Sequence, residues 1–269
     1  MVNIVINGNL GVDIRGVDLS VIYYANEYYS GTTLFQAIFD DSNWAEFRGT
    51  GFQYNWSGEP IAGTVKSYSV FIDGVRAAYI DGVSIAATAF ADAALSYGTK
   101  DDVTLMASAF KGNDTFKGGN LSDYYRLYGG NDTLLGNGGD DFLFGGAGND
   151  KITGGLGRDR LYGESGSDTF IFKSAKESTV SSTGRDTIYD FTNDDTIHLS
   201  AIDANTKVAG NQAFSFISTK AFTGKAGELR YDKKSSDTYI YADVNGDKKA
   251  DFAIHLDDAL TLSRDDFIL

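Results

Sequence analysis

Residues 145–153 read Gly-Gly-Ala-Gly-Asn-Asp-Lys-Ile-Thr, and this nine-residue unit recurs through the middle of the 269-residue chain. In each unit an aspartate is followed two residues later by an apolar or aromatic side chain, and in six of seven units a glycine precedes it by two residues. The aspartates are Asp114, Asp123, Asp132, Asp141, Asp150, Asp159 and Asp168. A fixed period indicates a repeat architecture. The alternative, ordinary Asp-Gly turns between hairpins, does not require a constant phase.

Each unit combines a tight turn with a short strand. Glycines reach positive φ at little cost, so a Gly-Gly-x-Gly run turns sharply and exposes its carbonyl groups. Lys151, Ile152 and Thr153 then alternate outward, inward and outward, as in a strand. Two units form one coil of eighteen residues, and stacked coils form two parallel sheets that bury their inner apolar rows. The pattern therefore predicts a mainly β fold with a parallel β-roll over residues 109–173.

Turns that are eighteen residues apart are expected on the same edge of the roll, one coil above the next. Their carboxylates and carbonyls could enclose a cation between them, at up to five sites. The candidate pairs are Asp114/Asp132, Asp123/Asp141, Asp132/Asp150, Asp141/Asp159 and Asp150/Asp168. Ca²⁺ accepts about 6–8 oxygen ligands in a flexible geometry, whereas Mg²⁺ requires a stricter octahedron. Because stacked carboxylates repel one another without a cation, we expect this segment to fold on binding Ca²⁺.

The repeat resembles the RTX nonapeptide, Gly-Gly-x-Gly-x-Asp-apolar, of proteins that Gram-negative bacteria export by type I secretion. The resemblance covers residues 112–172 and implies the parallel β-roll (RTX solenoid) of serralysin-like proteases. It also implies that the carbonyls of the second and third glycines bind Ca²⁺ with the aspartate. Leu121, Tyr128, Asn137 and Glu164 depart from glycine. The implied ligands for about three to five ions are Gly112, Asp114, Asp123, Gly130, Asp132, Asn137, Gly139, Asp141, Gly146, Gly148, Asp150, Gly155, Gly157, Asp159, Gly166 and Asp168.

After Phe172 the nine-residue period stops, and residues 174–269 are predicted to form an antiparallel β cap. Alternating patterns predict strands over 186–191, 195–200, 228–231, 238–242 and 251–256. This order is similar to the region after the roll in serralysins and alginate epimerases. Residues 262–269 resemble an uncleaved type I secretion signal, and they also fit an ordinary closing strand.

One loop in the C-terminal segment offers a further cation site. Asp243, Asn245, Asp247 and Asp251 resemble the start of a calcium loop, but Lys248 replaces the turn glycine of an EF-hand. A solvated hairpin turn is the alternative. The two histidines, His198 and His255, lie within strand patterns and are interpreted as structural.

Residues 1–108 are predicted to form a small α+β N-terminal cap. Helices are expected over 19–29 and 33–40, and β structure over 52–85 with hairpin turns at 73–74 and 81–82. Aromatic residues are frequent here: Tyr23, Tyr24, Tyr28, Tyr29, Trp44, Phe52, Tyr54 and Trp56. They could form a carbohydrate-binding face, or the core of a unit that covers the open end of the roll.

The composition excludes several classes of protein. The chain has a net charge of −14 and no cysteine, which disfavours nucleic acid as a partner and excludes disulfides and thiolate chemistry. No apolar run approaches the roughly 18–20 residues of a membrane span, and no Sec-type signal is visible. A glycine-rich, acidic chain of this kind favours hard cations and their oxygen ligands.

These observations predict a secreted, extracellular calcium-binding protein that the type I exporter handles during secretion. Its expected role is adhesion, through contact with polysaccharide or with a cell-surface or matrix component. The alternative is a small secreted enzyme that acts on polysaccharide, with catalysis in residues 1–108. A haem carrier would depend on a tyrosinate ligand, because residues 1–197 contain no histidine.

Overall fold

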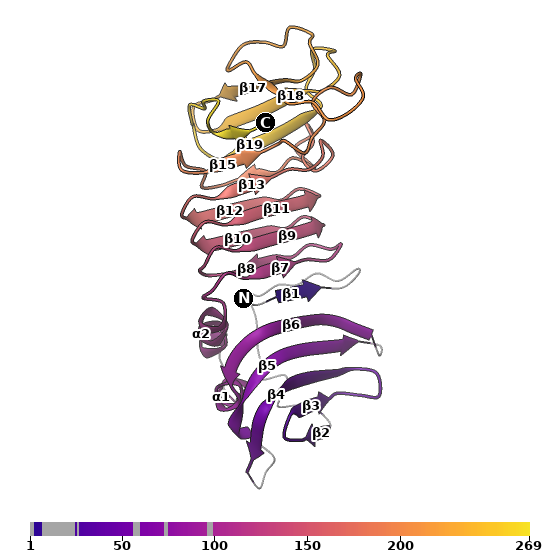
Figure 1. Cartoon of the computed structure of the whole chain (residues 1–269), viewed down its shortest axis with the longest axis vertical. Coiled ribbons are helices and arrows are strands. Elements are labelled where there is room, and N and C mark those ends of the chain that lie inside the picture. The colour runs from indigo at the N-terminus through magenta and orange to yellow at the C-terminus, as the bar shows by residue number, and fades with distance from the viewer. Residues whose placement is uncertain (1–2, 7–24, 26, 56–59, 73–74, 96–98) are drawn as a thin grey trace.

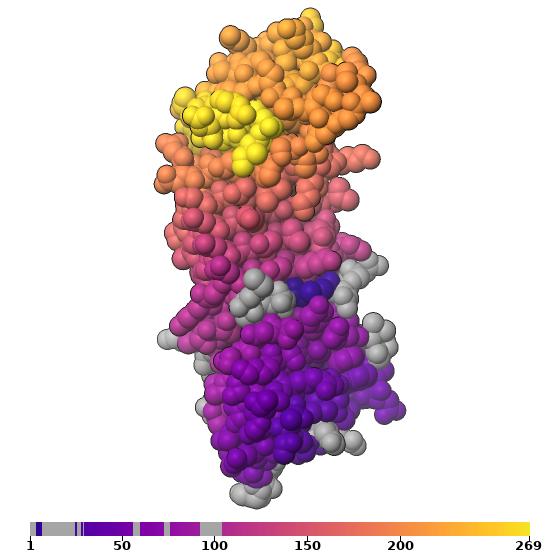
Figure 2. Space-filling model, viewed as in Figure 1, coloured from indigo at the N-terminus to yellow at the C-terminus, as the bar shows by residue number. Residues whose placement is uncertain are grey.

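The computed structural model describes residues 3–6, 25, 27–55, 60–72, 75–95 and 99–269. The molecule is elongated, with the N-terminal sheet at one end, the stacked coils in the middle and a C-terminal β unit at the other end (Figure 1). The space-filling view shows the three parts as one continuous rod (Figure 2). The described residues are mainly β, as the sequence predicted.

The repeats form the predicted β-roll. Its strands are β7 (Thr115–Lys117), β8 (Tyr124–Arg126), β9 (Thr133–Gly138), β10 (Phe142–Ala147), β11 (Lys151–Leu156), β12 (Arg160–Ser165) and β13 (Thr169–Ile171). Odd-numbered and even-numbered strands belong to two different sheets, and each pairs in parallel with the strand of the next coil. The register joins residues eighteen apart, for example Ile152 with Leu134. This confirms the eighteen-residue coil.

The second side chain of every strand in the roll points inward. The seven inward residues are at most 2% exposed: Phe116, Tyr125, Leu134, Leu143, Ile152, Leu161 and Phe170. Their neighbours along each strand point outward, which is the alternation expected of a strand with one buried face. Each coil buries only two such side chains, so the core depends on the stacking of successive coils.

The two sheets of the roll continue beyond residue 173, after the regular nine-residue repeat has ended. β14 (Thr187–Ile188) and β15 (Thr196–His198) continue the two sheets in parallel with β12 and β13. The coil that carries them is enlarged by a loop, so the step between paired residues is 27 instead of eighteen. β20 (Phe267–Ile268) then pairs in parallel with β15 at the C-terminal end of the chain.

The C-terminal unit adds an antiparallel hairpin sheet, as predicted. Its strands are β16 (Ser215–Phe216), β17 (Glu228–Lys233), β18 (Thr238–Asp243) and β19 (Phe252–Leu256). β18 is antiparallel to its two neighbours β17 and β19, β16 pairs in parallel with β17, and β19 pairs in parallel with β14 of the roll. The hairpin and the roll strands β8, β10, β12 and β14 therefore form one eight-stranded sheet.

At the other end, a mixed sheet joins the edge of the roll. The strands of this N-terminal part are β1 (Asn3–Ile6), β2 (Glu27–Ser30), β3 (Leu34–Ile38), β4 (Trp44–Tyr54), β5 (Pro60–Ile72) and β6 (Val75–Ala86). Two helices, α1 (Ala87–Leu95) and α2 (Thr99–Ala109), follow them. β1 lies between β6 and β7 and pairs with both. This pairing covers the strand edge that the first coil would otherwise expose.

Part of the N-terminal prediction was wrong. The helix expected over 33–40 is strand β3, because Phe35 and Ala37 pair with Phe47 and Ala45 across the sheet. Residues 27–29 of the other expected helix lie in β2, and residues 19–24 and 26 lie outside the described residues. The pair Asp81-Gly82 lies within β6, where Gly82 (φ +82°) marks an irregularity in place of a hairpin turn.

The β structure expected over 52–85 is confirmed by β4, β5 and β6. Residues 73–74 themselves lie outside the described residues, although Ile72 pairs with Val75 on either side of them. The two helices α1 and α2 were not predicted.

Candidate metal centre

The repeated aspartates form a ladder along the roll. In each case the Oδ1 atom of one aspartate accepts a hydrogen bond from the backbone N–H of the aspartate in the preceding coil. Asp123 donates to Asp141 over 2.8 Å, and Asp132 donates to Asp150 over 2.8 Å. The pairs Asp114/Asp132, Asp141/Asp159 and Asp150/Asp168 share this geometry, at 2.7, 2.9 and 2.8 Å. The structure therefore stacks all five aspartate pairs that the sequence predicted.

In several carboxylates of the ladder the second oxygen is buried without a hydrogen-bond donor. Within the described residues, this holds for the Oδ2 atoms of Asp132, Asp141, Asp150, Asp159 and Asp186. A buried carboxylate oxygen that lacks a donor is costly, because it has lost its hydration and gained nothing in exchange. The ladder thus has a row of oxygen atoms that require a positive partner.

In the repeats of Asp141, Asp150 and Asp159 a glycine five residues before the aspartate provides the space for this oxygen, whereas Leu127 holds that position before Asp132. A Cβ atom on Gly145 would lie 2.2 Å from Asp150 Oδ2, and one on Gly154 would lie 2.1 Å from Asp159 Oδ2. Carbonyl groups converge on the same place: a Cβ on Gly136 would lie 2.2 Å from Asp141 Oδ2 and 2.4 Å from the Gly154 carbonyl oxygen. The turn is therefore built so that several oxygen atoms approach one another.

The turn conformation is the same whether or not glycine is present. In the five repeats from Asp132 to Asp168 the residue four before the aspartate has positive φ, including Tyr128 (+61°), Asn137 (+71°) and Glu164 (+69°), which stand in place of glycine. Asparagine adopts this conformation more readily than other side chains do. The residue two before the aspartate is tighter still, since a Cβ on Gly148 would lie 1.9 Å from the Gly130 carbonyl oxygen. These carbonyls face the next coil.

Without a bound cation, burial makes the charged form of the ladder carboxylates unfavourable. It raises the pKa of Asp141 to about 8 and those of Asp132, Asp159 and Asp168 to about 7. The backbone N–H bonds act in the opposite direction, and neighbouring carboxylates of the ladder add to the increase for most of them. The pKa of Asp150 is also raised, mainly by burial. When these carboxylates are ionised, the folded ladder needs a positive charge to offset the cost of burying them.

The donor set fits a hard divalent cation. All the groups that converge on the turns are carboxylate and carbonyl oxygens, which Ca²⁺ accepts in flexible geometry. Asp123 lies at the edge of this pattern, because its Oδ2 already accepts a hydrogen bond from Gly119 N–H at 3.1 Å.

Comparison with known proteins agrees with this geometry. The family model described as the peptidase M10 serralysin C terminal matches residues 71–269, which is 199 of the 269 residues. The chain belongs to the serralysin C-terminal family. This family is of the RTX type, and its β-rolls bind Ca²⁺.

Solved structures also match this serralysin C-terminal chain. Two are the AlgE6R3 and AlgE6R2 subunits of the mannuronan C5-epimerase of Azotobacter vinelandii, at 29% and 27% identity. The matches cover 59% and 58% of this chain and 78% and 88% of those chains, with TM-scores of 0.27 and 0.31. The search of curated proteins gave no match. No helix in the described ranges is long and apolar enough to cross a membrane.

Two members of the ladder escaped the sequence prediction. Asp186 and Asp195 accept hydrogen bonds from the backbone N–H groups of Asp159 and Asp168, at 2.9 and 2.8 Å. Both lie three nine-residue periods after their partners, so the spacing of the repeat continues in the sequence although one aspartate position is missing. Glu177 stands at the intermediate phase position, and burial raises its pKa. The repeated Asp-Thr-Ile in 186–188 and 195–197 was the signal that could have revealed them.

The loop with Asp243, Asn245, Asp247 and Asp251 closes on itself. Asp243 accepts backbone hydrogen bonds from Gly246 (2.6 Å) and Lys248 (2.9 Å). Asp251 accepts one from the Val244 N–H (2.9 Å) and one from the Asn245 side chain (2.8 Å). Hydrogen bonds thus bring Asp243, Asn245 and Asp251 together in the turn between β18 and β19, and a calcium site there stays a prediction beside the hairpin-turn alternative.

The N-terminal aromatic residues divide between core and surface. Phe52 is buried, and the Tyr54 hydroxyl donates to the Gly31 carbonyl at 2.9 Å. The ring of Trp44 stacks on Phe71 at 4.4 Å, and Tyr28 is exposed. Tyr23, Tyr24 and Trp56, and the side chain of Tyr29, lie outside the described residues.

Proposed function

We propose that this chain is a secreted protein whose β-roll folds when it binds Ca²⁺. The row of buried Oδ2 atoms that lack donors carries this proposal. The proposed ligands are the aspartates of the ladder and the carbonyls of the turn residues two and four before them, with Asp186 added to the predicted set. About three to five ions would be held between successive coils. Bound Ca²⁺ supplies the positive charge that the ladder lacks.

Folding that depends on calcium suits type I export. An exporter passes an unfolded chain, and calcium is scarce in the cytosol and abundant outside the cell. The raised carboxylate pKa values support this proposal, because they oppose folding of the calcium-free roll at neutral pH. The chain would leave the cell unfolded and form the roll once it reaches extracellular calcium, without any need for disulfides.

We assign extracellular interaction, in the sense of adhesion to polysaccharide or matrix, to the N-terminal unit. The proposed division is residues 1–108 for this unit, 109–173 for the repeats and 174–269 for the C-terminal cap with the secretion signal. Exposed Tyr28 stacks on Phe35 at 5.8 Å, which leaves an aromatic surface at the outer edge of the sheet. Aromatic surfaces of this kind bind sugar rings as well as proteins.

Calorimetric titration with Ca²⁺ and, separately, with Mg²⁺ tests the calcium proposal. Asp150→Asn keeps the oxygen that accepts the Asp132 N–H but removes the charge shared by two coils, so it should lower the number or affinity of bound Ca²⁺ ions. Asp194→Asn, at an exposed acid outside the ladder, is the matched control and should bind as the wild type does. Equal calcium binding by the Asp150 variant and the wild type would contradict the ligand assignment.

A further inference from the structure

A second group of metal-ligating side chains lies outside the ladder, on the outer face of the eight-stranded sheet. His255 belongs to β19, at the position that pairs with Thr187 of β14 and Tyr239 of β18. Asp237 directly precedes β18, and Asp257 directly follows β19. Strand β14 of the roll and strands β18 and β19 of the hairpin thus meet at His255.

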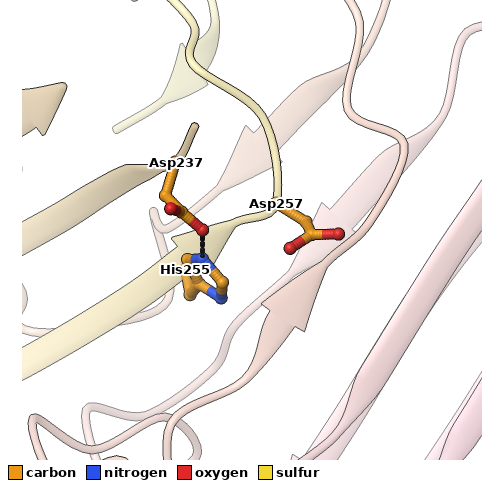
Figure 3. Close-up of side chains that lie close together, drawn as sticks. All are labelled: Asp237, His255 and Asp257. Atoms are coloured by element: carbon orange, nitrogen blue, oxygen red, sulfur yellow. Dashed lines mark hydrogen bonds and ion pairs between the residues drawn. The ribbon is translucent and has the colours of Figure 1, made fainter. Parts of the chain in front are cut away.

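The three side chains are close enough to share one ion. His255 Nε2 lies 2.7 Å from Asp237 Oδ1, and one ligand atom each from Asp237, His255 and Asp257 lie within 4.8 Å of one another. Figure 3 shows the Asp237–His255 contact and the carboxylate of Asp257 beside it. The exposed Asp257 side chain can rotate to complete the group.

The histidine ring is held in a defined orientation. The Tyr239 ring stacks on it, with centroids 4.8 Å apart and planes 16° from parallel. Its Nδ1 atom contacts the Thr187 hydroxyl at 3.2 Å, which turns Nε2 toward Asp237. Histidines that bind metals typically have such a hydrogen-bond partner on their other ring nitrogen.

We propose that Asp237, His255 and Asp257 form a transition-metal site of the Zn²⁺ class, separate from the calcium-binding turns. One ring nitrogen and two carboxylate oxygens are ligands that Zn²⁺ accepts, whereas Ca²⁺ binds oxygen atoms. Three protein ligands leave the fourth position open to water. The hydrogen bonds of Ser236 and His255 lower the pKa of Asp237, so its carboxylate is ionised at neutral pH. The competing explanation is a simple ion pair between Asp237 and protonated His255.

Zn²⁺ titration of the calcium-saturated chain distinguishes the two explanations. Excess Ca²⁺ fills the oxygen sites of the roll and keeps it folded if the calcium proposal is right, and the roll folds without Ca²⁺ if that proposal is wrong. The chain is folded in either case, so the Zn²⁺ result does not depend on the calcium proposal. The site predicts one saturable Zn²⁺ per wild-type chain and an affinity at least 100-fold lower in His255→Gln. His198→Gln is the matched control, because His198 lies in β15 of the opposite sheet and contacts Ser200 at 2.6 Å. It should bind Zn²⁺ as tightly as the wild type.

Two variants keep the test decisive if His255→Gln does not fold. Asp257→Asn changes an exposed side chain and should weaken Zn²⁺ binding about tenfold, as should Thr187→Val, which removes the partner of Nδ1. Co²⁺ offers a spectroscopic readout: its visible absorption should appear in the wild type and His198→Gln and be absent in His255→Gln. No saturable Zn²⁺ binding by the wild type, or unchanged binding in His255→Gln, would overturn the proposal in favour of the ion pair.

Discussion

Replacing Asp141 with asparagine is expected to stabilise the calcium-free roll at pH 8 and to weaken the calcium-bound one. Asp141 is fully buried, and burial raises its pKa from 3.8 to about 8. The folded chain therefore holds a proton at this carboxyl that the unfolded chain releases above pH 4. Because the raised pKa disfavours the charged form, the calcium-free fold loses stability as the pH rises from about 4 to about 8.

The magnitude follows from the size of the increase. About four pH units at 1.36 kcal/mol each give about 6 kcal/mol for Asp141 at pH 8. This cost is comparable with the entire stability of about 5–15 kcal/mol of a typical domain, and burial of Asp159, which also raises its pKa, acts in the same direction. The calcium-free roll should therefore be unfolded at pH 8 and regain strand structure at pH 5.

Asparagine removes the charge while keeping the shape. Its oxygen can still accept the hydrogen bond that the Asp123 N–H donates over 2.8 Å. Its NH₂ group would replace Oδ2. That atom and the Gly154 carbonyl oxygen both lie next to Gly136, within 2.4 Å of the place that a Cβ atom would take there. An amide donor beside a carbonyl acceptor is favourable, whereas two oxygens there are not. The calcium-free variant should therefore gain up to about 6 kcal/mol at pH 8 and close to nothing at pH 4.

Urea denaturation of calcium-stripped protein, followed by far-UV circular dichroism at pH 4, 6 and 8, measures the difference. At pH values where the wild-type roll is unfolded, the gain is read as recovered strand signal. Asp194→Asn serves as the control and should follow the wild type at every pH. The reasoning is refuted if Asp141→Asn is less stable than the wild type without calcium at pH 8, or if its gain is as large at pH 4 as at pH 8.

Four further substitutions test the packing of the calcium-loaded chain by urea denaturation. Gly148→Ala should lower the free energy of unfolding by at least about 2 kcal/mol, because its Cβ would lie 1.9 Å from a carbonyl oxygen and its φ is +132°. Gly112→Ala is the control: its Cβ would meet open space, so the free energy of unfolding should change by less than about 0.5 kcal/mol. Phe144→Ala should cost about 1–2 kcal/mol, because its ring stacks on a neighbouring tyrosine at 4.3 Å on the outer face of the roll. Phe267→Ala should lower the free energy of unfolding by about 3–5 kcal/mol, because this ring is buried on the closing strand β20. Equal stabilities of all the variants would contradict the packing described.

The roll could be predicted from the sequence because each of its rules acts within one period. The inward position of Ile152 and the turn before it depend on residues a few positions away, and repetition makes the signal strong. The stacking of aspartates eighteen residues apart follows from the same period. Asp186 and Asp195 were missed because the enlarged coil interrupts the repeat for one unit, at Glu177, before the phase returns.

Other features depend on partners that no local pattern contains. Residues 33–40 have apolar spacing compatible with a helix, but Phe35 and Ala37 find their partners in β4, and the strand results. The orientation of each ladder carboxylate is also a property of the stack, since one oxygen binds a backbone N–H of the preceding coil and the other is left for a cation. His255 was interpreted as structural because it lies in a strand pattern, and that pattern does not contain its contacts Asp237 and Thr187, which are 18 and 68 positions away.

The most direct test of the central claim is far-UV circular dichroism during a calcium titration of chelator-treated protein at pH 8, with Mg²⁺ as the control. The ladder predicts a cooperative gain of β signal with Ca²⁺ that Mg²⁺ does not reproduce, because the buried carboxylates require a cation that accepts many oxygen ligands in flexible geometry. A fully folded spectrum that does not respond to Ca²⁺ would contradict the account, since the repeats would then stack without the metal.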